Sequence, residues 1–542
     1  MAEPLRETAA WRRLQWHHAE IRHLHLRELV RDDPTRGERL ATEAAGLHLD
    51  YSKHLVTDDT LDLLRKVAAE RDLAGRIEAM FRGEPVNVSE GRPALHVALR
   101  MPRSRSLVVD GVDVVREVHE ELERIDALAD AIRTGGWTGA TGTRIRNILN
   151  LGIGGSDLGP AMAYEALRPY AAEELELRFV ANVDPADLAR AARGLEPEET
   201  LVVVVSKTMT TLETIRNAEA ARAWLATAVG DDVAAHFVAV TASPEAAAAL
   251  GIPPGHVFRM WDWVGGRTSL CSAVGISLAI ALGQRGFREL LAGFHALDVH
   301  FRSTPLGANL PAIAGLLAIW YRGLFGLQSR AVIPYAHALR MMPAYLQQLE
   351  MESLGKSVTD AGEPVELDTG AIVWGGEGTN AQHAFFQLLH QGTTVVPLDL
   401  VVFARSAEGP AERHDLLAAS AFAQAEALAF GRTAEELEDA GVPAETIPHR
   451  VMPGNRPTSL ILGRQLDPAT LGALIAYYEH SVFTQAAVWG IDPFDQWGVE
   501  LGKELASRIA PELAPGWKRE LLHDPSTNAL IRRYRQLRDD DR

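Results

Sequence analysis

The chain has 542 residues, of which 47% are apolar and 23% are charged, and its formal net charge at pH 7 is −18. This composition is typical of a globular protein and excludes disorder over any long span, and the length allows two domains or one large body with extensions. The negative charge argues against a nucleic-acid or anionic-membrane partner, whose phosphates would be repelled. An anionic ligand therefore needs a locally positive site.

Cysteine content and hydropathy predict the compartment. Cys271 is the only cysteine, which forbids an internal disulfide and fits a reducing compartment. The first twenty residues lack the continuous apolar core of a secretion signal. The most apolar window, Cys271 to Leu282, is too short to span a bilayer. We therefore expect a cytoplasmic protein without a membrane segment.

Residues 1–110 are predicted to be mostly helical, and no chemistry stands out among them. Four histidines lie between His17 and His25. Their spacing does not place three on one helical face, and no carboxylate pattern accompanies them. We expect a solvated helix there and no metal site.

Residues 111–285 alternate between short β-branched runs and helical spacing. Such alternation predicts a mostly parallel sheet covered by helices on both faces. The predicted elements are helix 112–132, strand 145–151, helix 160–167, strand 177–182, strand 201–205 with a helix after it, strands 237–241 and 257–259, and helix 270–282.

A second alternating block is predicted over residues 286–510, followed by a charged C-terminal arm at 511–542. The sequence thus predicts an α/β protein with an N-terminal helical region, two mostly parallel sheets flanked by helices, and an arm. The predicted elements of the second block are helix 311–321, strand 331–334, helix 336–352, strand 371–374, helix 380–390, strand 394–403, and helices 411–430 and 468–488, with a surface excursion at 435–457.

The stretch LVVVVSKTMTTLETIRNAEAA, residues 201–221, changes its period within a run of hydroxyl residues. Its first five residues are typical of a buried parallel strand, and helical spacing follows. Thr210 and Glu213 have the spacing of a capping box, which predicts a helix beginning at Thr210 or the next residue. The amides and dipole of a helix N-terminus favour an anion. Residues 206–211 are therefore interpreted as a phosphate-binding loop; the alternative is an ordinary turn with surface threonines.

A glycine-rich stretch at 150–160 follows a predicted strand and opens a helix. A dinucleotide fingerprint is excluded, because the sixth position counted from Gly152 is Asp157 rather than glycine, and no P-loop lysine follows. Closely spaced glycines still let a backbone approach a small anionic ligand. Gly155 and Ser156 are therefore candidates for a sugar-phosphate pocket; the alternative is a tight turn alone.

Charged side chains stand at two further candidate positions. Arg267 follows two glycines at a predicted strand end and offers a fixed charge to a phosphate or an oxyanion; the alternative is a structural salt bridge. Glu350 and Glu352 lie two apart on a predicted helix, so at most one of them faces a given site. Spacing does not choose between them, and the alternative for each is a solvated carboxylate.

Two later segments complete the candidates. His383 enters a helix from a glycine loop, which makes it an acid–base candidate, although a lone histidine is more often structural. Gln496 and Lys503 lie seven residues apart and share a helical face if that helix is continuous. The alternative for Lys503 is a solvated face.

Taken together, these segments resemble the phosphoglucose isomerase family, over about two thirds of the chain. The resemblance implies two sugar-isomerase (SIS) domains, a homodimer, and interconversion of glucose 6-phosphate and fructose 6-phosphate. It implies neither metal nor nicotinamide, because a proton leaves one carbon and returns to its neighbour. The segments, in order, are GIGGSDLGP, SKTMTTLET, VGGRTSL, QQLEMES, GTNAQHAFFQLLHQGT and FDQWGVELGK.

Carried over by motif, the resemblance also implies roles for individual residues. Glu352 becomes the base that moves a proton between C2 and C1, and Arg267 stabilises the enediolate. His383, reaching the site from the partner subunit, opens the ring with the help of Lys503. The substrate phosphate is assigned to Ser156, Ser206, the Lys207 amide, Thr208 and Thr211, and the sugar site to Gly155, Gly266, Gln348 and Gln496.

Three positions depart from the residues usual in the family. Leu354 stands where asparagine is usual, Ala381 where glycine is common, and Met209 where phenylalanine is usual. Leu354 removes an amide two residues from Glu352, which bears on the support of that base and on substrate breadth.

Two other functions are weighed against the dedicated isomerase. A bifunctional phosphoglucose/phosphomannose isomerase belongs to the same class, but the chain length and the complete set of segments favour the dedicated enzyme. A non-catalytic sugar-phosphate-binding regulator needs the loop at 206–211. It has no use for Glu352, His383, Arg267 and Lys503 together.

Overall fold

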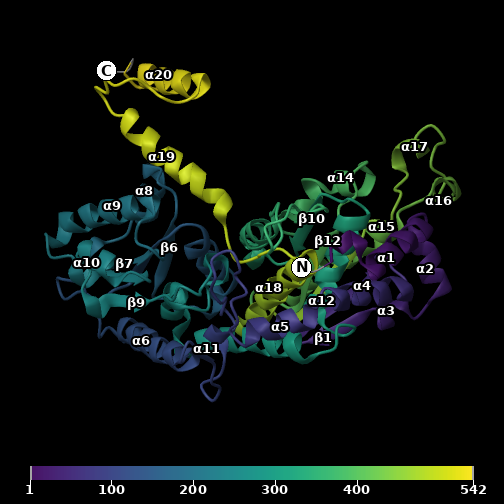
Figure 1. Cartoon of the computed structure of the whole chain (residues 1–542), viewed down its shortest axis with the longest axis horizontal. Helices are drawn as coiled ribbons and strands as arrows, with labels where there is room; N and C mark the ends of the chain where they lie inside the picture. Colours follow the sequence, from purple (N-terminus) through teal and green to yellow (C-terminus); the bar gives the residue numbers. More distant parts are fainter. Residues whose placement is uncertain (1–2, 540–542) are drawn as a thin grey trace. The chain divides into compact units, whose positions relative to one another are not determined.

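A computed structural model describes residues 3–539 of the chain. Its contacts define two compact units, Met1–Phe494 and Asp495–Arg542. The first unit contains two sheets, each between layers of helices (Figure 1). The described residues include no helix that is both long and apolar enough to cross a membrane.

The first sheet has five parallel strands in the order β6-β5-β7-β8-β9. Alternate strand residues face opposite sides: Val202 and Val204 pack under α8, α9 and α10, whereas Val203 and Val205 join the core beneath α6, α7 and α11 (Figure 1). Burial on both faces explains the continuous valine run. The strands are β5 (Asn147–Leu151), β6 (Glu176–Val180), β7 (Thr200–Val205), β8 (Phe237–Thr241) and β9 (Val257–Arg259), and the helices are α6 (Val114–Thr134), α7 (Leu158–Ala166), α8 (Pro185–Ala192), α9 (Leu212–Val229), α10 (Pro244–Ala249) and α11 (Ile276–Ser303).

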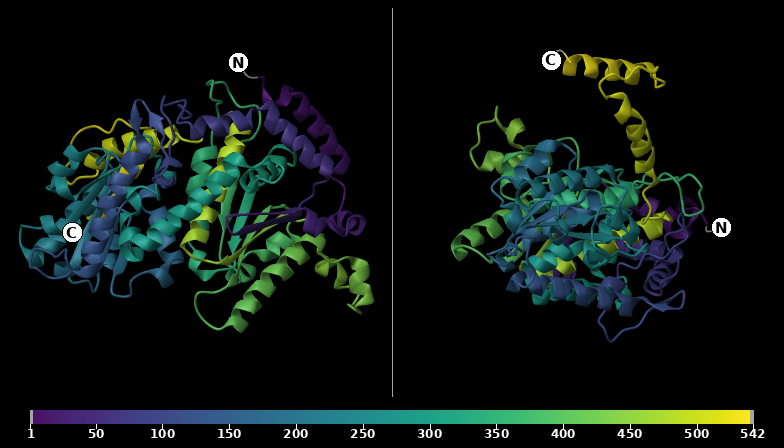
Figure 2. Two further views of the ribbon diagram at one scale, coloured as in Figure 1. Left: turned by 90° about the horizontal axis from the view of Figure 1, so that it is seen from below. Right: turned by 90° about the vertical axis from the view of Figure 1, so that its left-hand side faces the viewer.

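The second sheet has six strands in the order β1-β2-β13-β12-β10-β11, of which the last four are mutually parallel. It lies between α15 and α18 (Figure 2, left), with α14 and α12 completing the two layers. The strands are β1 (Ala41–Ala44), β2 (Leu47–Lys53), β10 (Ser329–Pro334), β11 (Ile372–Gly375), β12 (Leu398–Arg405) and β13 (Thr458–Gln465), and the helices are α12 (Leu310–Ile319), α13 (Met342–Leu346), α14 (Phe386–Gln391), α15 (Ala411–Phe430) and α18 (Pro468–Trp489).

The N-terminal region contributes a hairpin that the sequence analysis missed. Strands β1 and β2 pair antiparallel with each other, and β2 pairs antiparallel with β13. Leu47, Leu49 and Tyr51 alternate with polar residues and are buried, which is the period of a half-buried strand. The predicted helices of this region are α1 (Ala9–Ile21), α2 (Leu26–Asp32), α3 (Arg36–Arg39), α4 (Asp58–Glu70) and α5 (Leu73–Phe81).

Smaller elements complete the chain. A short hairpin, β3 and β4, precedes α6, and the predicted excursion at 435–457 holds two short helices. The second compact unit consists mainly of two helices. These elements are β3 (Val108–Val109), β4 (Val112–Asp113), α16 (Ala434–Asp439), α17 (Ile447–Arg450), α19 (Glu500–Glu512) and α20 (Pro525–Asp539). The predicted domain boundaries at 110, 285 and 510 stay predictions.

Three predicted helices have different lengths or shapes in the structure. The helix expected at 270–282 begins at Ile276, is interrupted by Gly283 at φ +70°, and continues to Ser303. The helix expected at 336–352 is a 3₁₀ turn, the short α13 and a π-helical turn over Gln347–Glu352. The helix expected at 380–390 is a 3₁₀ turn followed by α14. Apolar spacing alone does not distinguish these helix types, because all of them bury a similar stripe.

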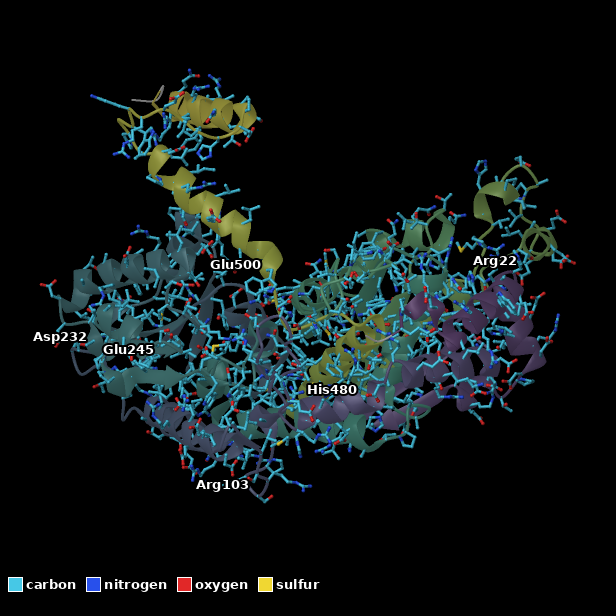
Figure 3. All side chains as sticks on the ribbon, viewed as in Figure 1. Arg22, Arg103, Asp232, Glu245, His480 and Glu500 are labelled. Atoms are coloured by element: carbon cyan, nitrogen blue, oxygen red, sulfur yellow. The ribbon has the colours of Figure 1, made fainter. Side chains whose placement is uncertain are left out.

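Helices α11 and α18 cross closely and enclose a fully buried ionic network. The Arg100 guanidinium donates to both carboxylate oxygens of Asp298 at 2.7 Å and to Glu479 Oε2 at 2.6 Å. His480 Nε2 lies 2.7 Å from Asp298 Oδ1. In Figure 3 His480 lies inside the ribbon, whereas Arg103 and Asp232 lie at its outer edge. The network satisfies charges that would be costly to bury alone.

Two glycines permit this crossing. A methyl group on Gly293 of α11 would lie 1.8 Å from the Ala469 carbonyl oxygen of α18, and one on Gly472 would lie 2.2 Å from that of Leu290. Any side chain at either position forces the helices apart, so the sequence requires glycine at both.

We expect Gly293→Ala to lower the free energy of unfolding by about 1–3 kcal/mol, because the helices must separate to admit the methyl group. Gly255→Ala is the matched control, since a methyl group there meets nothing within 4 Å. Urea unfolding measures both. Equal urea midpoints for Gly293→Ala and the unmodified chain would contradict the packing described.

Candidate active site

Two candidate loops meet where the order of the first sheet reverses. Strand β5 pairs with β6 on one side and with β7 on the other. In open parallel sheets, ligands bind at the carboxyl ends of the strands beside such a switch point. The loops after β5 and β7 carry the glycine stretch 152–156 and the hydroxyl run 206–211. The topology therefore brings the two predicted ligand loops to one crevice.

The hydroxyl loop is held by its own side chains. Ser206 Oγ lies 3.2 Å from Thr211 Oγ1 and accepts a hydrogen bond from the Met209 amide at 3.1 Å, and Thr208 Oγ1 lies 2.7 Å from Thr210 Oγ1. The predicted capping box is wrong, because α9 begins one residue later than expected and no side chain caps it. An uncapped first turn leaves backbone amides available to an anion.

Met209 fixes the conformation of this loop. Its backbone adopts φ +50°, which residues other than glycine seldom do. Its side chain is buried beneath α9. Burial of the thioether in the core offsets the strain of the backbone. The departure from phenylalanine at this position thus keeps an apolar anchor.

The Lys207 side chain ties the hydroxyl loop to the segment that carries Arg267. Its ammonium donates to the carbonyl oxygens of Asp262 at 2.7 Å and Val264 at 3.1 Å. Burial, with help from the charge of Arg92, lowers the pKa of Lys207 to about 8. The group therefore remains a cation at neutral pH and adds positive charge beside the loop.

Gly155 and Gly266 are in direct backbone contact. A methyl group on Gly155 would lie 2.0 Å from the Gly266 carbonyl oxygen. The Ser269 hydroxyl lies between the two glycines. Its Oγ is 2.6 Å from the Gly266 carbonyl oxygen and 3.4 Å from the Gly155 carbonyl oxygen. Only glycine allows the loop after β5 to approach the Arg267 segment this closely.

Arg267 is buried and anchored on three sides. Its Nε donates to Ser353 Oγ at 2.6 Å, its Nη1 lies 3.3 Å from Glu352 Oε2, and its Nη2 donates to the Pro493 carbonyl oxygen. The side chain is 3% exposed and that of Glu352 is 23% exposed. A buried arginine thus faces a carboxylate that is still open to a ligand.

The two neighbouring glutamates have opposite environments, as the sequence analysis expected of residues two apart. Glu350 is buried against Arg330, whose Nη1 also lies 3.2 Å from Asp399 Oδ2. Burial raises the pKa of Glu350 to about 7 against the opposing pull of Arg330. Glu352, on the same π-helical turn, faces Arg267. Glu350 is therefore part of the core, whereas Glu352 remains accessible beside Arg267.

Gln348 points from the π-helical turn toward the glycine loop. Its Oε1 is buried and, among the described residues, has no hydrogen-bond partner. A methyl group on Gly154 would lie 3.1 Å from Gln348 Nε2. An unpartnered buried amide oxygen costs free energy unless a ligand donates to it. Gln348 thus supplies an acceptor within the Gly155–Arg267–Glu352 cluster.

The cavity beside Arg267 is small. It has a volume of about 20 Å³ and is lined by Arg267, Ser353 and His96 among others. A cavity of this size holds one water rather than a hexose phosphate. A sugar ligand therefore needs walls or movements beyond this cavity.

His383, Gln496 and Lys503 lie outside the elements just described. His383 is exposed on the 3₁₀ turn after β11. Gln496 precedes a 3₁₀ turn and Lys503 lies on α19 of the second unit, with Nζ 3.2 Å from Glu500 Oε1. Gln496 lies before the 3₁₀ turn that leads into α19, so the continuous helix on which a shared face depended is absent between Gln496 and Lys503. The roles of all three residues stay predictions.

Several contacting residues had no signal in the sequence analysis. Ser353 and the Pro493 carbonyl hold Arg267, and Arg330 holds Glu350. Ser353 directly follows Glu352, so its position in the sequence could have indicated that it lies at the site. Pro493 and Arg330 are far away in sequence, so only the tertiary structure reveals them.

Two departures from the usual residues are buried substitutions. Leu354 is 1% exposed in the main core, and a methyl group on Gly370 would lie 3.2 Å from its Cβ. Ala381 is buried beneath the second sheet. An asparagine at position 354 would need hydrogen-bond partners that this apolar setting lacks, so leucine suits the packing.

Asp157 ends the glycine loop in a partly buried position. Burial, with a smaller effect of the Asp187 charge, raises the pKa of Asp157 to about 6.

Within residues 3–539, no group of three or more His, Cys, Asp or Glu side chains is arranged to hold a metal ion.

Two mostly parallel sheets with an arginine–carboxylate pair between their loops place the chain among the SIS-type α/β proteins. Comparison with known proteins gives the family. The profile of phosphoglucose isomerase matches residues 50–531, and the chain belongs to the phosphoglucose isomerase family.

Named relatives agree with this membership. The chain is 58% identical over 539 residues to the glucose-6-phosphate isomerase of Anaeromyxobacter dehalogenans strain 2CP-C, covering 99% of this chain and 98% of that one. It is 57% identical over 545 residues to that of Deinococcus deserti, covering 99% and 100%. The crystal structure of a glucose-6-phosphate isomerase from Chlamydia trachomatis D/UW-3/Cx superposes with a TM-score of 0.86 at 33% identity, covering 99% and 100%.

We expect Asp157→Asn to stabilise the protein at pH 8 by up to about 3 kcal/mol, the equivalent of a pKa raised from 3.8 to about 6. The native state binds this proton more tightly than the unfolded chain, so its stability falls as pH rises from about 4 to about 6 and stays lower above that range. The gain from the substitution should vanish near pH 4. Urea unfolding at both pH values measures it.

The exposed Asp232→Asn is the control and should change little at either pH. A variant at position 157 that is no more stable than the unmodified chain at pH 8 would show that the Asp157 charge is compensated in the native state.

Proposed function

We propose that the protein interconverts glucose 6-phosphate and fructose 6-phosphate by ring opening and proton transfer through an enediolate. The observation that carries this proposal is the 3.3 Å contact between buried Arg267 and accessible Glu352 beside the glycine contact. Membership of the phosphoglucose isomerase family supports it. We further propose that the protein acts as a cytoplasmic homodimer.

The phosphate group would bind at the first sheet. We assign it to the hydroxyls of Ser206, Thr208 and Thr211, the Lys207 amide and Ser156. The support is the uncapped first turn of α9 and the position of the two loops at the sheet's switch point. Neutral donors and a helix N-terminus hold a dianion without requiring a metal. The Lys207 ammonium keeps this loop in register with the Arg267 segment.

The sugar would extend from this loop toward Glu352. In the open-chain aldose, the Glu352 carboxylate takes the C2 proton, and the carbonyl oxygen at C1 becomes the enediolate oxygen. Returning that proton to C1, while the proton of the C2 hydroxyl passes to O1 and C2 becomes the carbonyl, gives the ketose, so both protons stay within the substrate. Arg267 would stabilise the developing negative charge without exchanging a proton.

The remaining candidates would open and orient the sugar ring. We assign ring opening to His383 of the partner subunit, helped by Lys503, and sugar binding to Gly155, Gly266, Gln348 and Gln496. The exposure of His383 and the small cavity beside Arg267 support a site completed by a second chain. The unpartnered Gln348 oxygen supports a hydroxyl donor from the ligand.

A regulator that binds sugar phosphates without converting them is the alternative from another class. It would need the loop at 206–211 but not the ion pair of Arg267 with Glu352. Burying an arginine beside a partly exposed carboxylate lowers the free energy of unfolding, and a binding module has no use for such a pair. The ion pair therefore favours the enzyme.

We expect Glu352→Gln to lower kcat for fructose 6-phosphate by about 10²–10⁴-fold, because the amide cannot take the C2 proton. A coupled assay measures this, with the exposed Glu435→Gln as a control that should keep full activity. If the unmodified chain binds fructose 6-phosphate without converting it, the regulator replaces the enzyme. Mannose 6-phosphate offered in parallel tests the bifunctional alternative.

We expect that mixing Glu352→Gln and His383→Ala subunits restores activity, because each heterodimer would hold one site with both native residues. Random assortment should recover roughly a quarter of the native activity in an equal mixture. Each variant alone is the control. No recovery in heterodimers verified by mass would place His383 in its own subunit's site or outside the reaction.

A further inference from the structure

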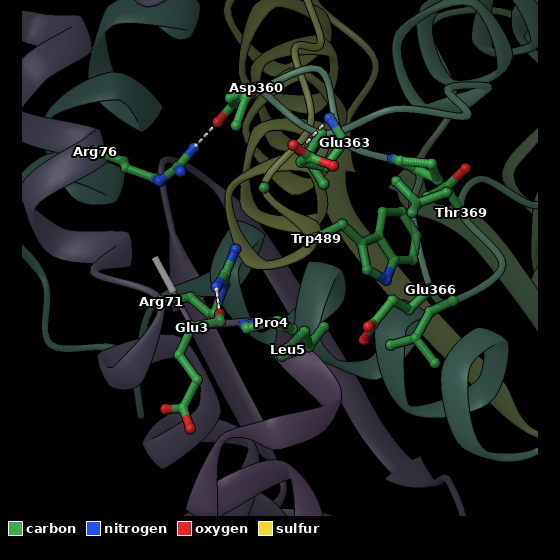
Figure 4. A pocket seen from close by; sticks show the side chains of 16 residues that line it. Glu3, Pro4, Leu5, Arg71, Arg76, Asp360, Glu363, Glu366, Thr369 and Trp489 are labelled. Carbon is green, nitrogen blue, oxygen red and sulfur yellow. Dashed lines mark hydrogen bonds and ion pairs between the residues drawn. The ribbon is translucent and has the colours of Figure 1, made fainter. Parts of the chain in front are cut away.

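A second and larger cavity lies away from the residues assigned to the sugar phosphate. It has a volume of about 400 Å³, within the range of small-molecule sites. Its walls come from the N-terminal segment 3–5, the chain between Thr359 and Thr369, and the end of α18 (Figure 4). No residue that lines it belongs to the proposed catalytic or phosphate-binding set.

One wall carries a buried donor that has no partner. Trp489 is 5% exposed, and its indole Nε1 has no hydrogen-bond partner among the described residues. Figure 4 shows the indole among the lining side chains, with Glu366 beside it. A buried N–H left unpaired costs free energy, so a ligand that accepts from it gains affinity.

The backbone on both sides of Trp489 is fixed. Arg71 Nε donates to the Val488 carbonyl oxygen at 2.9 Å, and the Asp360 amide donates to the Gly490 carbonyl oxygen at 2.8 Å. These bonds hold the indole against the cavity. The site is therefore formed before any ligand arrives.

The charge of the cavity excludes anions. Four carboxylates line it against two guanidinium groups, and both arginines are occupied: Arg71 by two carbonyl oxygens, Arg76 by Asp360 at 2.8 Å. The carboxylates of Glu363 and Glu366 stand at the rim as acceptors. A ligand that matches this wall is neutral or cationic, and it carries N–H donors.

The rest of the lining is apolar and suits a flat ring. Pro4, Leu5, Val365 and Leu367 surround the indole. We propose that this cavity binds a neutral nitrogen heteroaromatic ligand of nucleobase to nucleoside size, with a ring nitrogen accepting from the Trp489 indole and an exocyclic amine donating to Glu366.

Isothermal titration of the full chain with adenosine tests the proposal. Adenosine should bind saturably at one site per chain. Adenosine 5′-monophosphate, which adds a negatively charged phosphate group, should bind at least about tenfold more weakly because of the carboxylates. No saturable binding of adenosine up to about 5 mM, a weak-ligand limit, or equal affinity for the monophosphate would overturn the proposal.

Variants locate the site. Trp489→Phe keeps the ring but removes the N–H, and it should weaken adenosine about fivefold. Trp16→Phe, the same change at an exposed position, should leave the affinity unchanged. Equal effects of the two would contradict the assignment. If Trp489→Phe does not fold, Glu366→Gln is tested instead. It should reduce the ratio of the affinity for adenosine to the affinity for its monophosphate, and an unchanged ratio would refute the site.

A competition experiment separates this cavity from the sugar-phosphate site. Saturating fructose 6-phosphate should leave the affinity for adenosine within about twofold, because no lining residue is shared. Mutually exclusive binding would place adenosine in the sugar-phosphate site and overturn the proposal, whether or not the chain is an isomerase.

Discussion

The position of Arg267 is the constraint on which the site depends. Its guanidinium binds groups from two elements that lie far apart in the chain: the π-helical turn after β10, and the segment that follows α18. Removing a partner would leave the buried guanidinium with less charge compensation. The glycine contact on the first sheet and the π-helical turn that carries Glu352 are therefore linked through a single side chain.

The π-helical turn places two glutamates, two residues apart, in different environments. Glu350 is committed to Arg330 and the second sheet, which fixes the turn to the core. Glu352 does not contribute to that anchor; it contacts Arg267 and is partly exposed. The buried Glu350 anchors the turn while Glu352 stays accessible, which is the combination that the proposed proton transfer would need. The ionic network around Arg100 gives similar rigidity to the α11–α18 crossing.

Much of this architecture was predictable from the sequence, for reasons visible in particular residues. The valine run of β7 and the hydroxyl residues after it predicted the strand and the loop that leads into α9, since both signals are local. Glu352 could not be chosen over Glu350 from spacing, because the choice depends on Arg330 and Asp399 in other strands. The capping box was wrong because α9 begins at Leu212 without a side-chain cap, after a loop in which Met209 adopts φ +50°. The hairpin β1–β2 was missed although Leu47, Leu49 and Tyr51 alternate, because neighbouring helices dominated the interpretation.

That hairpin ties the beginning of the chain to its end. Strand β2, complete at Lys53, pairs with β13, which begins at Thr458. At translation rates of about 5–20 residues per second, the partner strand emerges roughly 20–80 s after β2. Throughout that time β2 has an unpaired edge and an uncovered apolar face, which are the features that invite aggregation. The newly made N-terminal region therefore cannot complete its sheet until β13 has been made.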